Sequence, residues 1–364
     1  MAIAKNHDEL YKVLKQYMEL EGMSRYEDDV AKTLKENTKS AGFKYSRDGM
    51  GSLIMNKVGD SKGPKIQITA HMDEVGYLVR DITDKGMVKL SMVGGIWSSV
   101  VVGTHGYLTT SSGKRMIGVF GHTSIHIMKA EARTKAITLD ELYFDIGLSS
   151  KKDAEKLGIE PGDTVQMSGK SFRMSGNDDI VVGKAMDDRA GITVIDQLVQ
   201  KLKGKKNPNN LFVVGTVQEE VGTRGAKTSV SQIKPDVAIA IDTCASHDTP
   251  GAISGIQSLG KGTALRVKDG GTMMDPKLTD FLFKLGKKHN IPVYKYVAQG
   301  GGTDAGELQF GKGGVPTLTI SIPQRYLHSP LGASSLDDIK AVLDLITEFI
   351  KTFGSEELKN ISYK

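Results

Sequence analysis

The fold is decided by the stretch IQITAHMDEVG, residues 66–76 of a 364-residue chain. Ile66, Ile68 and Ala70 alternate with polar residues, and this period of two is typical of a β-strand with one buried face. The strand runs directly into His71 and the acidic residues after it. We therefore expect a buried strand whose carboxyl end carries polar, metal-binding types of side chain.

Helices and strands alternate on both sides of this stretch. Two amphipathic helices are predicted in the first forty residues and another over residues 190–202. A last helix is expected to begin at Ser335, with Asp338 in a capping-box-like position. Further strands are predicted at residues 211–217, 237–241 and 315–322. Strands separated by helices indicate an α/β fold with a mixed, mostly parallel sheet covered by helices.

Residues 76–177 interrupt this alternation. They contain short β-rich pieces separated by glycines, with little helical periodicity. We expect this segment to form a small inserted domain that resembles a β-barrel. Residues 1–75 and 178–364 then form one larger α/β domain.

The composition excludes several classes of protein. Its 39% hydrophobic and 25% charged residues are typical of a globular protein and not of a disordered or collagen-like chain. We expect no membrane association, since no apolar run approaches the ~18–20 residues of a membrane helix and the N-terminus does not resemble a secretory signal. The single cysteine, Cys244, fits a reducing compartment, so a cytoplasmic location is expected. A net charge of +5, with scattered basic residues, gives no indication of nucleic-acid binding.

Metal-binding types of side chain follow several of the predicted strands. They are His71 and Asp73, Asp187 and Asp188, Glu219 and Glu220, Asp242, and His328. In an open α/β sheet, side chains at the carboxyl ends of successive strands converge on one crevice. Imidazoles together with carboxylates suit divalent ions such as zinc, cobalt or manganese.

The number of these ligands favours two ions over one. A two-metal site needs a bridging carboxylate and about two further ligands per ion. In the pair Glu219-Glu220, one carboxylate can bind metal while the other takes a proton from water. Asp73 lies two residues after His71, on the same side of an extended segment, where it can accept the second imidazole N–H. Each group alone also fits a turn, a helix cap or solvated surface, but several acidic groups after apolar strands repel one another unless cations bind.

Five motifs of the chain resemble those of one known family. They are AHMDEVG at residues 70–76, KAMDDR at 184–189, VQEEVG at 217–222, AID at 240–242 and YLHS at 326–329. In order and spacing they resemble the dinuclear metallo-aminopeptidases that assemble into tetrahedral dodecamers, a group that includes glutamyl and deblocking aminopeptidases. The resemblance extends over nearly the whole chain.

The resemblance implies two divalent metal ions per subunit, zinc or cobalt, with manganese also compatible. It assigns His71 and Asp242 to one ion and Glu220 and His328 to the other. Asp187 is expected to bridge the two ions.

The resemblance also implies catalytic roles. Glu219 is expected to be the general base, and Asp73 to support catalysis by orienting the imidazole. The peptide bond between Asp187 and Asp188 is expected to be cis. A glycine-rich segment near the substrate pocket is expected to contribute Gly301, Gly302, Thr303 and Asp304. From the residues alone, these glycines fit a tight turn equally well.

The activity implied is hydrolysis of the N-terminal residue of short peptides by a metal-activated water. The inserted domain is expected to mediate dimerisation, and the dimers to build a hollow dodecamer with inward-facing active sites. The preference for the first residue stays open between a broad or leucine type and an acidic type.

Two other functions stay open. A different dinuclear metallohydrolase on the same fold, a deacylase or a carboxypeptidase, would cleave blocked or C-terminal bonds. A catalytically idle assembly subunit would be expected to lack Glu219 or a metal ligand, and this chain has all of them. A glycosidase, as which some members of the family have been labelled, uses paired carboxylates without metal and leaves the histidines unexplained.

Overall fold

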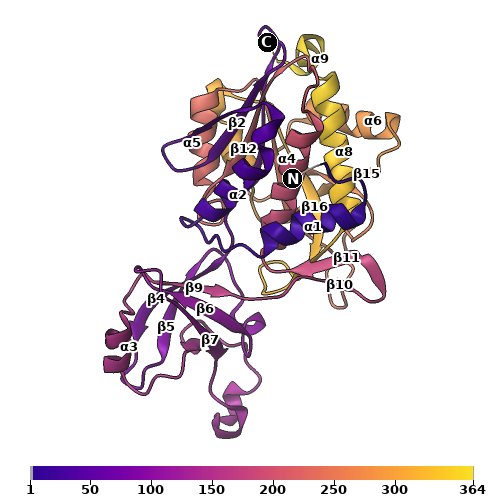
Figure 1. Ribbon diagram of the computed structural model, residues 1–364. Coiled ribbons are helices and arrows are strands. Elements are labelled where there is room, and N and C mark those ends of the chain that lie inside the picture. Colours follow the sequence, from indigo (N-terminus) through magenta and orange to yellow (C-terminus); the bar gives the residue numbers. More distant parts are fainter. Residues whose placement is uncertain (1–2, 364) are drawn as a thin grey trace.

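The computed structural model describes residues 3–363, and Figure 1 shows two parts, one above the other. The upper part contains a large sheet covered by helices, and the lower part is a closed β-barrel. No helix within residues 3–363 is long and apolar enough to cross a membrane.

The large sheet has eleven strands and a parallel centre. The central strands, in spatial order, are β12 (Asn210–Thr216), β3 (Lys65–His71), β13 (Val237–Ala245) and β16 (Thr317–Arg325). Antiparallel strands extend both sides: β1 (Lys44–Arg47), β2 (Leu53–Val58), β17 (Gly332–Ser335), β11 (Asn177–Gly183) and β10 (Phe172–Met174). β14 (Thr263–Lys268) pairs with β16 and with β15 (Val293–Val297). The predicted fold class is confirmed.

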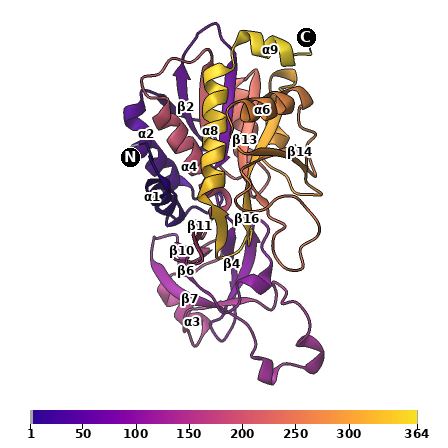
Figure 2. The same ribbon diagram turned by 90° about the vertical axis from the view of Figure 1, so that its right-hand side faces the viewer.

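Helices cover both faces of this sheet. One layer contains α1 (His7–Met18), α2 (Asp28–Thr38), α4 (Met186–Lys201), α6 (Pro276–Lys288) and α8 (Leu336–Thr352), and Figure 2 shows α8 along the sheet in front of β13 and β16. The short C-terminal helix α9 (Ser355–Ile361) contacts α6. The other layer contains α5 (Arg224–Ile233) and α7 (Ala305–Leu308), which contact β12, β13 and β16.

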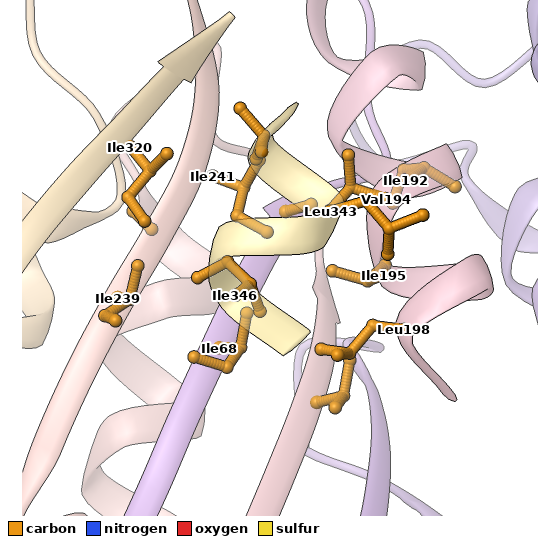
Figure 3. Close-up of a cluster of buried hydrophobic side chains, with 14 of the residues drawn as sticks. Ile68, Ile192, Val194, Ile195, Leu198, Ile239, Ile241, Ile320, Leu343 and Ile346 are labelled. Carbon is orange, nitrogen blue, oxygen red and sulfur yellow. The ribbon is translucent and has the colours of Figure 1, made fainter. Parts of the chain in front are cut away.

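Branched aliphatic side chains fill the space between the sheet and the first helix layer. Figure 3 shows Ile68, Ile239 and Ile320 of the strands packing against Ile195 of α4 and Ile346 of α8. All five side chains are fully buried. Full burial stabilises the fold by roughly 1.5–3 kcal/mol per side chain of this kind, so the central strands and their carboxyl ends are firmly placed.

The inserted part closes on itself as a barrel of six strands. In order around the barrel these are β4 (Gly76–Ile82), β5 (Val88–Val93), β8 (Tyr143–Asp145), β7 (Arg115–Gly121), β6 (His105–Thr109) and β9 (Thr164–Met167), with helix α3 (Lys151–Leu157) alongside. The barrel has its own core, in which Phe120 lies between Tyr77 and Phe144 with ring centroids 5.4 and 4.9 Å apart. Strand β10, within the range expected for the insert, pairs with β11 in the large sheet.

The start of α8 differs from the sequence prediction. Ser335 caps the helix by accepting a hydrogen bond from the amide of Asp337 at 3.2 Å. The Asp338 carboxylate instead accepts from the amides of Gly260 and Gly262, at 2.8 and 2.6 Å. The capping-box prediction is therefore wrong, because the Asp338 carboxylate binds two amides of a neighbouring loop and not the backbone amide of Ser335.

Candidate metal centre

The strand register brings the predicted ligands to one edge of the sheet. His71 is the last residue of β3. Ala240 of β13 pairs with Thr69 of β3, which places Asp242 level with His71. The turn after β12 adds residues 219–220 beside them, since β12 and β3 run parallel and end together. Asp242 lies within β13, which continues beyond the predicted end.

The two aspartates at the start of α4 have different roles. The peptide bond between Asp187 and Asp188 is cis, as expected. The Asp187 carboxylate lies between two imidazoles, with Oδ1 3.0 Å from His71 Nε2 and Oδ2 3.3 Å from His328 Nε2. The Asp188 carboxylate accepts from the amide of Gly191 at 2.8 Å and so caps the helix.

Two groups of three potential ligands share Asp187. One consists of His71, Asp187 and Asp242, and the other of Asp187, Glu220 and His328. Within each group the ligand atoms lie within 4.8 Å of one another. The arrangement matches two adjacent cation sites with one shared carboxylate.

Backbone carbonyls orient both imidazoles. His71 Nδ1 lies 3.0 Å from the carbonyl oxygen of Asp73 and 3.4 Å from its carboxylate. Both the carbonyl and the carboxylate of Asp73 thus lie near this nitrogen, the carbonyl being the nearer of the two. His328 Nδ1 lies 2.7 Å from the carbonyl oxygen of Gly95 in the inserted part. In both residues Nε2 is therefore the nitrogen directed at the shared carboxylate.

Burial and the negative charges of neighbouring carboxylates raise the pKa of most acidic groups in this site. Burial, reinforced by the charge of Asp187, raises the pKa of Glu220 to about 8 and that of Asp242 to about 7. Burial and the charges of Asp242 and Glu220 also raise the pKa of Glu219. Although burial acts against ionisation, hydrogen bonds from His328 and His71 hold the pKa of Asp187 below its usual value. Cations would relieve this repulsion.

The donor set passes a test of fit for divalent metal. Glu220 Oε1 is buried and accepts no hydrogen bond, an arrangement that costs free energy unless a cation or donor is present. It lies 3.4 Å from His328 Nε2, so a single ion could contact both atoms. Two imidazoles with several carboxylates suit zinc, cobalt or manganese.

A cavity of about 890 Å³ opens onto these ligands. Its lining includes Glu219, the apolar residues Val297 and Phe310, and Arg266. This volume is large enough for a short peptide.

The structure separates the predicted substrate-pocket residues into two sets. Gly301, Gly302 and Thr303 line the cavity. Asp304 is buried, and its carboxylate accepts from the hydroxyl of Thr216 at 2.6 Å. It therefore faces the end of β12.

Three residues near the centre were missed by the sequence analysis. Ser24 donates to the Asp73 carboxylate at 2.6 Å, Glu27 accepts from the amide of Gln218 at 3.0 Å, and Gly95 contacts His328. The available signal was the S-x-x-E spacing of Ser24 and Glu27, which is typical of a helix start and not of a site.

Comparisons with known proteins agree with this geometry. Residues 51–345 match the family described as M42 glutamyl aminopeptidase. The glutamyl aminopeptidase of Lactococcus lactis subsp. cremoris is 32% identical over 356 residues, which cover 97% of this chain and 99% of the relative.

Solved structures are similar over nearly the full length. The aminopeptidase APDkam598 of the archaeon Desulfurococcus kamchatkensis has a TM-score of 0.92 and 33% identity, covering 98% of this chain and 99% of that one. The TET1 peptidase of Pyrococcus horikoshii, which can assemble into a tetrahedron or a large octahedral shell, has a TM-score of 0.84 and 30% identity, covering 94% and 99%. The chain belongs to the M42 glutamyl aminopeptidase family and is a peptide hydrolase.

Proposed function

We propose that the protein is a metal-dependent aminopeptidase that removes the N-terminal residue of short peptides. The observation that carries this proposal is the position of Asp187 between two groups of three ligands, on the wall of a peptide-sized cavity. Membership of an aminopeptidase family supports the same reaction.

In this proposal His71 and Asp242 hold one divalent ion, Glu220 and His328 hold a second, and Asp187 contacts both. Zinc or cobalt suits this donor set best, and manganese is compatible. When bound, such ions supply the Lewis acidity that makes water nucleophilic at neutral pH and polarises a carbonyl oxygen.

Glu219 is the proposed general base. Its carboxylate lines the cavity beside both ligand groups, and its raised pKa favours accepting a proton from the attacking water. The same carboxylate then delivers the proton to the leaving amine. Asp73 supports catalysis through its carbonyl contact to His71 and through its carboxylate, which binds the Glu219 amide at 2.9 Å.

Gly301, Gly302 and Thr303 are the proposed contacts to the peptide, since all three line the cavity. Asp304 belongs to the same segment but is not among the residues that line the cavity. It supports the segment by accepting a hydrogen bond from Thr216.

The proposal also covers assembly and location. Residues 1–75 and 178–364 form the catalytic domain, and the insert, residues 76–177, forms the dimerisation domain. Exposed apolar side chains of β7, Ile117 and Val119, support an interface on the barrel. Dimers would build a tetrahedral dodecamer, as the similar TET1 peptidase builds a tetrahedron. The single free cysteine fits the proposed cytoplasmic location.

The test is amino-acid release from free and N-acetylated tetrapeptides with acidic, basic and apolar first residues. The protein is stripped by a chelator and restored with zinc, cobalt or manganese. We expect metal-dependent release of the first residue only, no reaction of acetylated peptides, and a loss of ~10³-fold in kcat for Glu219→Gln with metal content unchanged.

Three other results would contradict the proposal. Cleavage of the acetyl group would indicate a deacylase, and release of the last residue would indicate a carboxypeptidase. Two bound ions with no release from any peptide would indicate an idle assembly subunit.

A further inference from the structure

Two carboxylates from distant segments hold the turn that carries Glu219. The amide of Gln218 donates to Glu27 Oε1 at 3.0 Å. The amides of Glu219 and Glu220 donate to the two oxygens of Asp73, at 2.9 and 3.2 Å. Three consecutive amides of this turn are therefore bound by acidic side chains, and hydrogen bonds to carboxylates are stronger than those to neutral acceptors.

The backbone of this turn needs such support. Gln218 has φ of 56°, in the left-handed region that residues other than glycine disfavour. Its own side chain gives weak support: Oε1 accepts from Arg224 Nη1 at 3.4 Å, and the buried Nε2 atom has no hydrogen-bond partner among the described residues. The contact from Glu27 is made at the residue directly before the proposed base.

Glu27 and the residue that supports Asp73 both come from one short segment before α2. Glu27 is 5% exposed and also accepts from the amide of Arg25 at 2.9 Å. Ser24, three residues earlier, donates to Asp73 Oδ2 at 2.6 Å. The segment is fixed to the sheet at Glu74, whose amide donates to the carbonyl of Gly22 at 2.9 Å.

Glu27 has no other part in the site. It is in neither ligand group and does not line the cavity. A buried carboxylate placed behind a cluster of acidic residues adds repulsion, so its presence calls for a specific partner. The amides that it binds provide one.

We propose that Glu27 is a positioning residue that, by holding Gln218, sets where the Glu219 carboxylate lies relative to a bound peptide. This inference rests on the proposed function, in which Glu219 is the general base. A displacement of ~1 Å in a reacting group can lower the rate ~10²-fold. The cavity walls that bind the peptide are not altered, so kcat falls and KM stays nearly constant.

The test compares Glu27→Ala and Glu27→Gln in the full-length, metal-loaded enzyme. We expect Glu27→Ala to lower kcat ~10–100-fold with KM within about twofold of wild type. Glu27→Gln keeps an oxygen that accepts from the Gln218 amide, so it should restore kcat to within about threefold of wild type. Metal content, measured by mass spectrometry, should stay at the wild-type level in both variants.

Asp163 in the barrel provides a matched control. It is 4% exposed, and its carboxylate accepts from two backbone amides, those of Ser111 and Glu160, both at 2.9 Å. Asp163→Ala should lower the melting temperature as Glu27→Ala does but leave kcat unchanged. If Glu27→Ala does not fold, Glu27→Asp provides the second test. Its side chain is one carbon shorter, so the hydrogen bond from the Gln218 amide is lengthened or lost, and a ~3–10-fold lower kcat with unchanged KM is expected.

Four results would overturn the positioning role. The first is a wild-type kcat in Glu27→Ala, or in Glu27→Asp where that variant replaces it, and the second is a Glu27→Gln variant no better than Glu27→Ala. The third is an equal loss of kcat in Asp163→Ala, and the fourth is a loss of metal that accounts for the loss of kcat. Glu219→Gln, measured in parallel, separates the two hypotheses. If Glu219→Gln is active, the proposed function itself fails; if it is inactive and Glu27→Ala is fully active, only the positioning role fails.

Discussion

The fold holds the two proposed ligand groups in different ways. His71 and Asp242, here called the strand-borne half, lie on neighbouring parallel strands, and the His71 side chain is 2% exposed. Glu220 and His328, the loop-borne half, lie outside the strands, and the His328 side chain is 29% exposed. His328 also has φ of 52°. Sheet register therefore places one half, whereas loop contacts place the other.

The loop-borne half depends on the inserted barrel as well. The imidazole of His328 is oriented by the carbonyl of Gly95, which follows β5 of the barrel. The strand-borne half has no such contact, because His71 is oriented by the carbonyl of Asp73 in its own domain. The Asp187 carboxylate therefore joins a buried group of side chains placed by strands to a more exposed group placed by loops.

Substitution of the two histidines should give the largest contrast. We expect His71→Ala to lower kcat by ~10³-fold or more at any metal concentration. Without the imidazole, only the buried carboxylates of Asp187 and Asp242 are left to hold the ion of the strand-borne half. His328→Ala should weaken the binding of one ion ~10–100-fold, with activity partly restored by excess metal. Activity and metal content against added zinc or cobalt provide the measurement. Equal losses in both variants would remove the distinction between the halves.

Chelation should separate the halves in time. The more exposed loop-borne half should open more often and lose its ion first, with a half-time ~10-fold shorter than that of the strand-borne half. Metal content followed during dialysis against a chelator should show two phases. A single phase carrying both ions would contradict the comparison.

The barrel loop provides a smaller, sterically defined test. Gly94 has φ of 76°, and an added Cβ would lie 2.6 Å from Val75 Cγ1 and 3.3 Å from Glu220 Cβ. At the neighbouring Gly95 the nearest atom to an added Cβ, His328 Nδ1, is 3.8 Å away. We expect Gly94→Ala to weaken binding of the loop-borne ion ~3–10-fold and Gly95→Ala to be within about twofold of wild type. Metal titration of the two variants checks this, and a larger effect of Gly95→Ala would refute it.

The pH dependence of metal binding should show the smallest difference between the two halves. Burial raises the pKa of Glu220 to about 8, and hydrogen bonding to Asp187 outweighs burial and raises that of His328 to about 10. In the strand-borne half, burial raises the pKa of Asp242 to about 7. Hydrogen bonds that the His71 imidazole donates to Asp187 and Asp73 outweigh burial and raise the pKa of His71. Ligands must lose their protons to bind metal, so affinity should increase as the pH rises from 6 to 9.

Between pH 7 and 8 the loop-borne half should release more protons on binding metal than the strand-borne half, because the pKa of Glu220 is higher than that of Asp242. Calorimetric titration of the metal-free protein in buffers of different ionisation enthalpy measures these numbers. An affinity that falls with rising pH would contradict the assignment of these groups as ligands.

The strand-borne half could be predicted from the sequence, because a strand has a local pattern. The alternation over residues 66–70 places His71, and the apolar run over 237–241 leads to Asp242. The exact end of that strand could not be predicted, since β13 continues to Ala245 through residues that also suit a loop.

Long-range contacts were beyond the reach of local pattern. Glu27 binds an amide 191 residues away in the chain, and no nearby residue indicates this partner. Ser335 and Asp338 show the same S-x-x-[DE] spacing as Ser24 and Glu27. In both pairs the acidic side chain accepts hydrogen bonds from amides of a loop or turn that is distant in the sequence. Tertiary packing brings these amides to the carboxylate, so the local spacing cannot predict the contact.

Under the proposed ligand role of His328, its late position in the chain sets the earliest time at which the protein becomes active during its own synthesis. It is translated 257 residues after His71, which at ~5–20 residues per second corresponds to about 13–50 s. During that interval the nascent chain can build the barrel and the strand-borne half while lacking the last ligand. Under the proposed function, a nascent chain that has not yet reached His328 is therefore inactive, and activity is expected only once nearly the whole chain has been made.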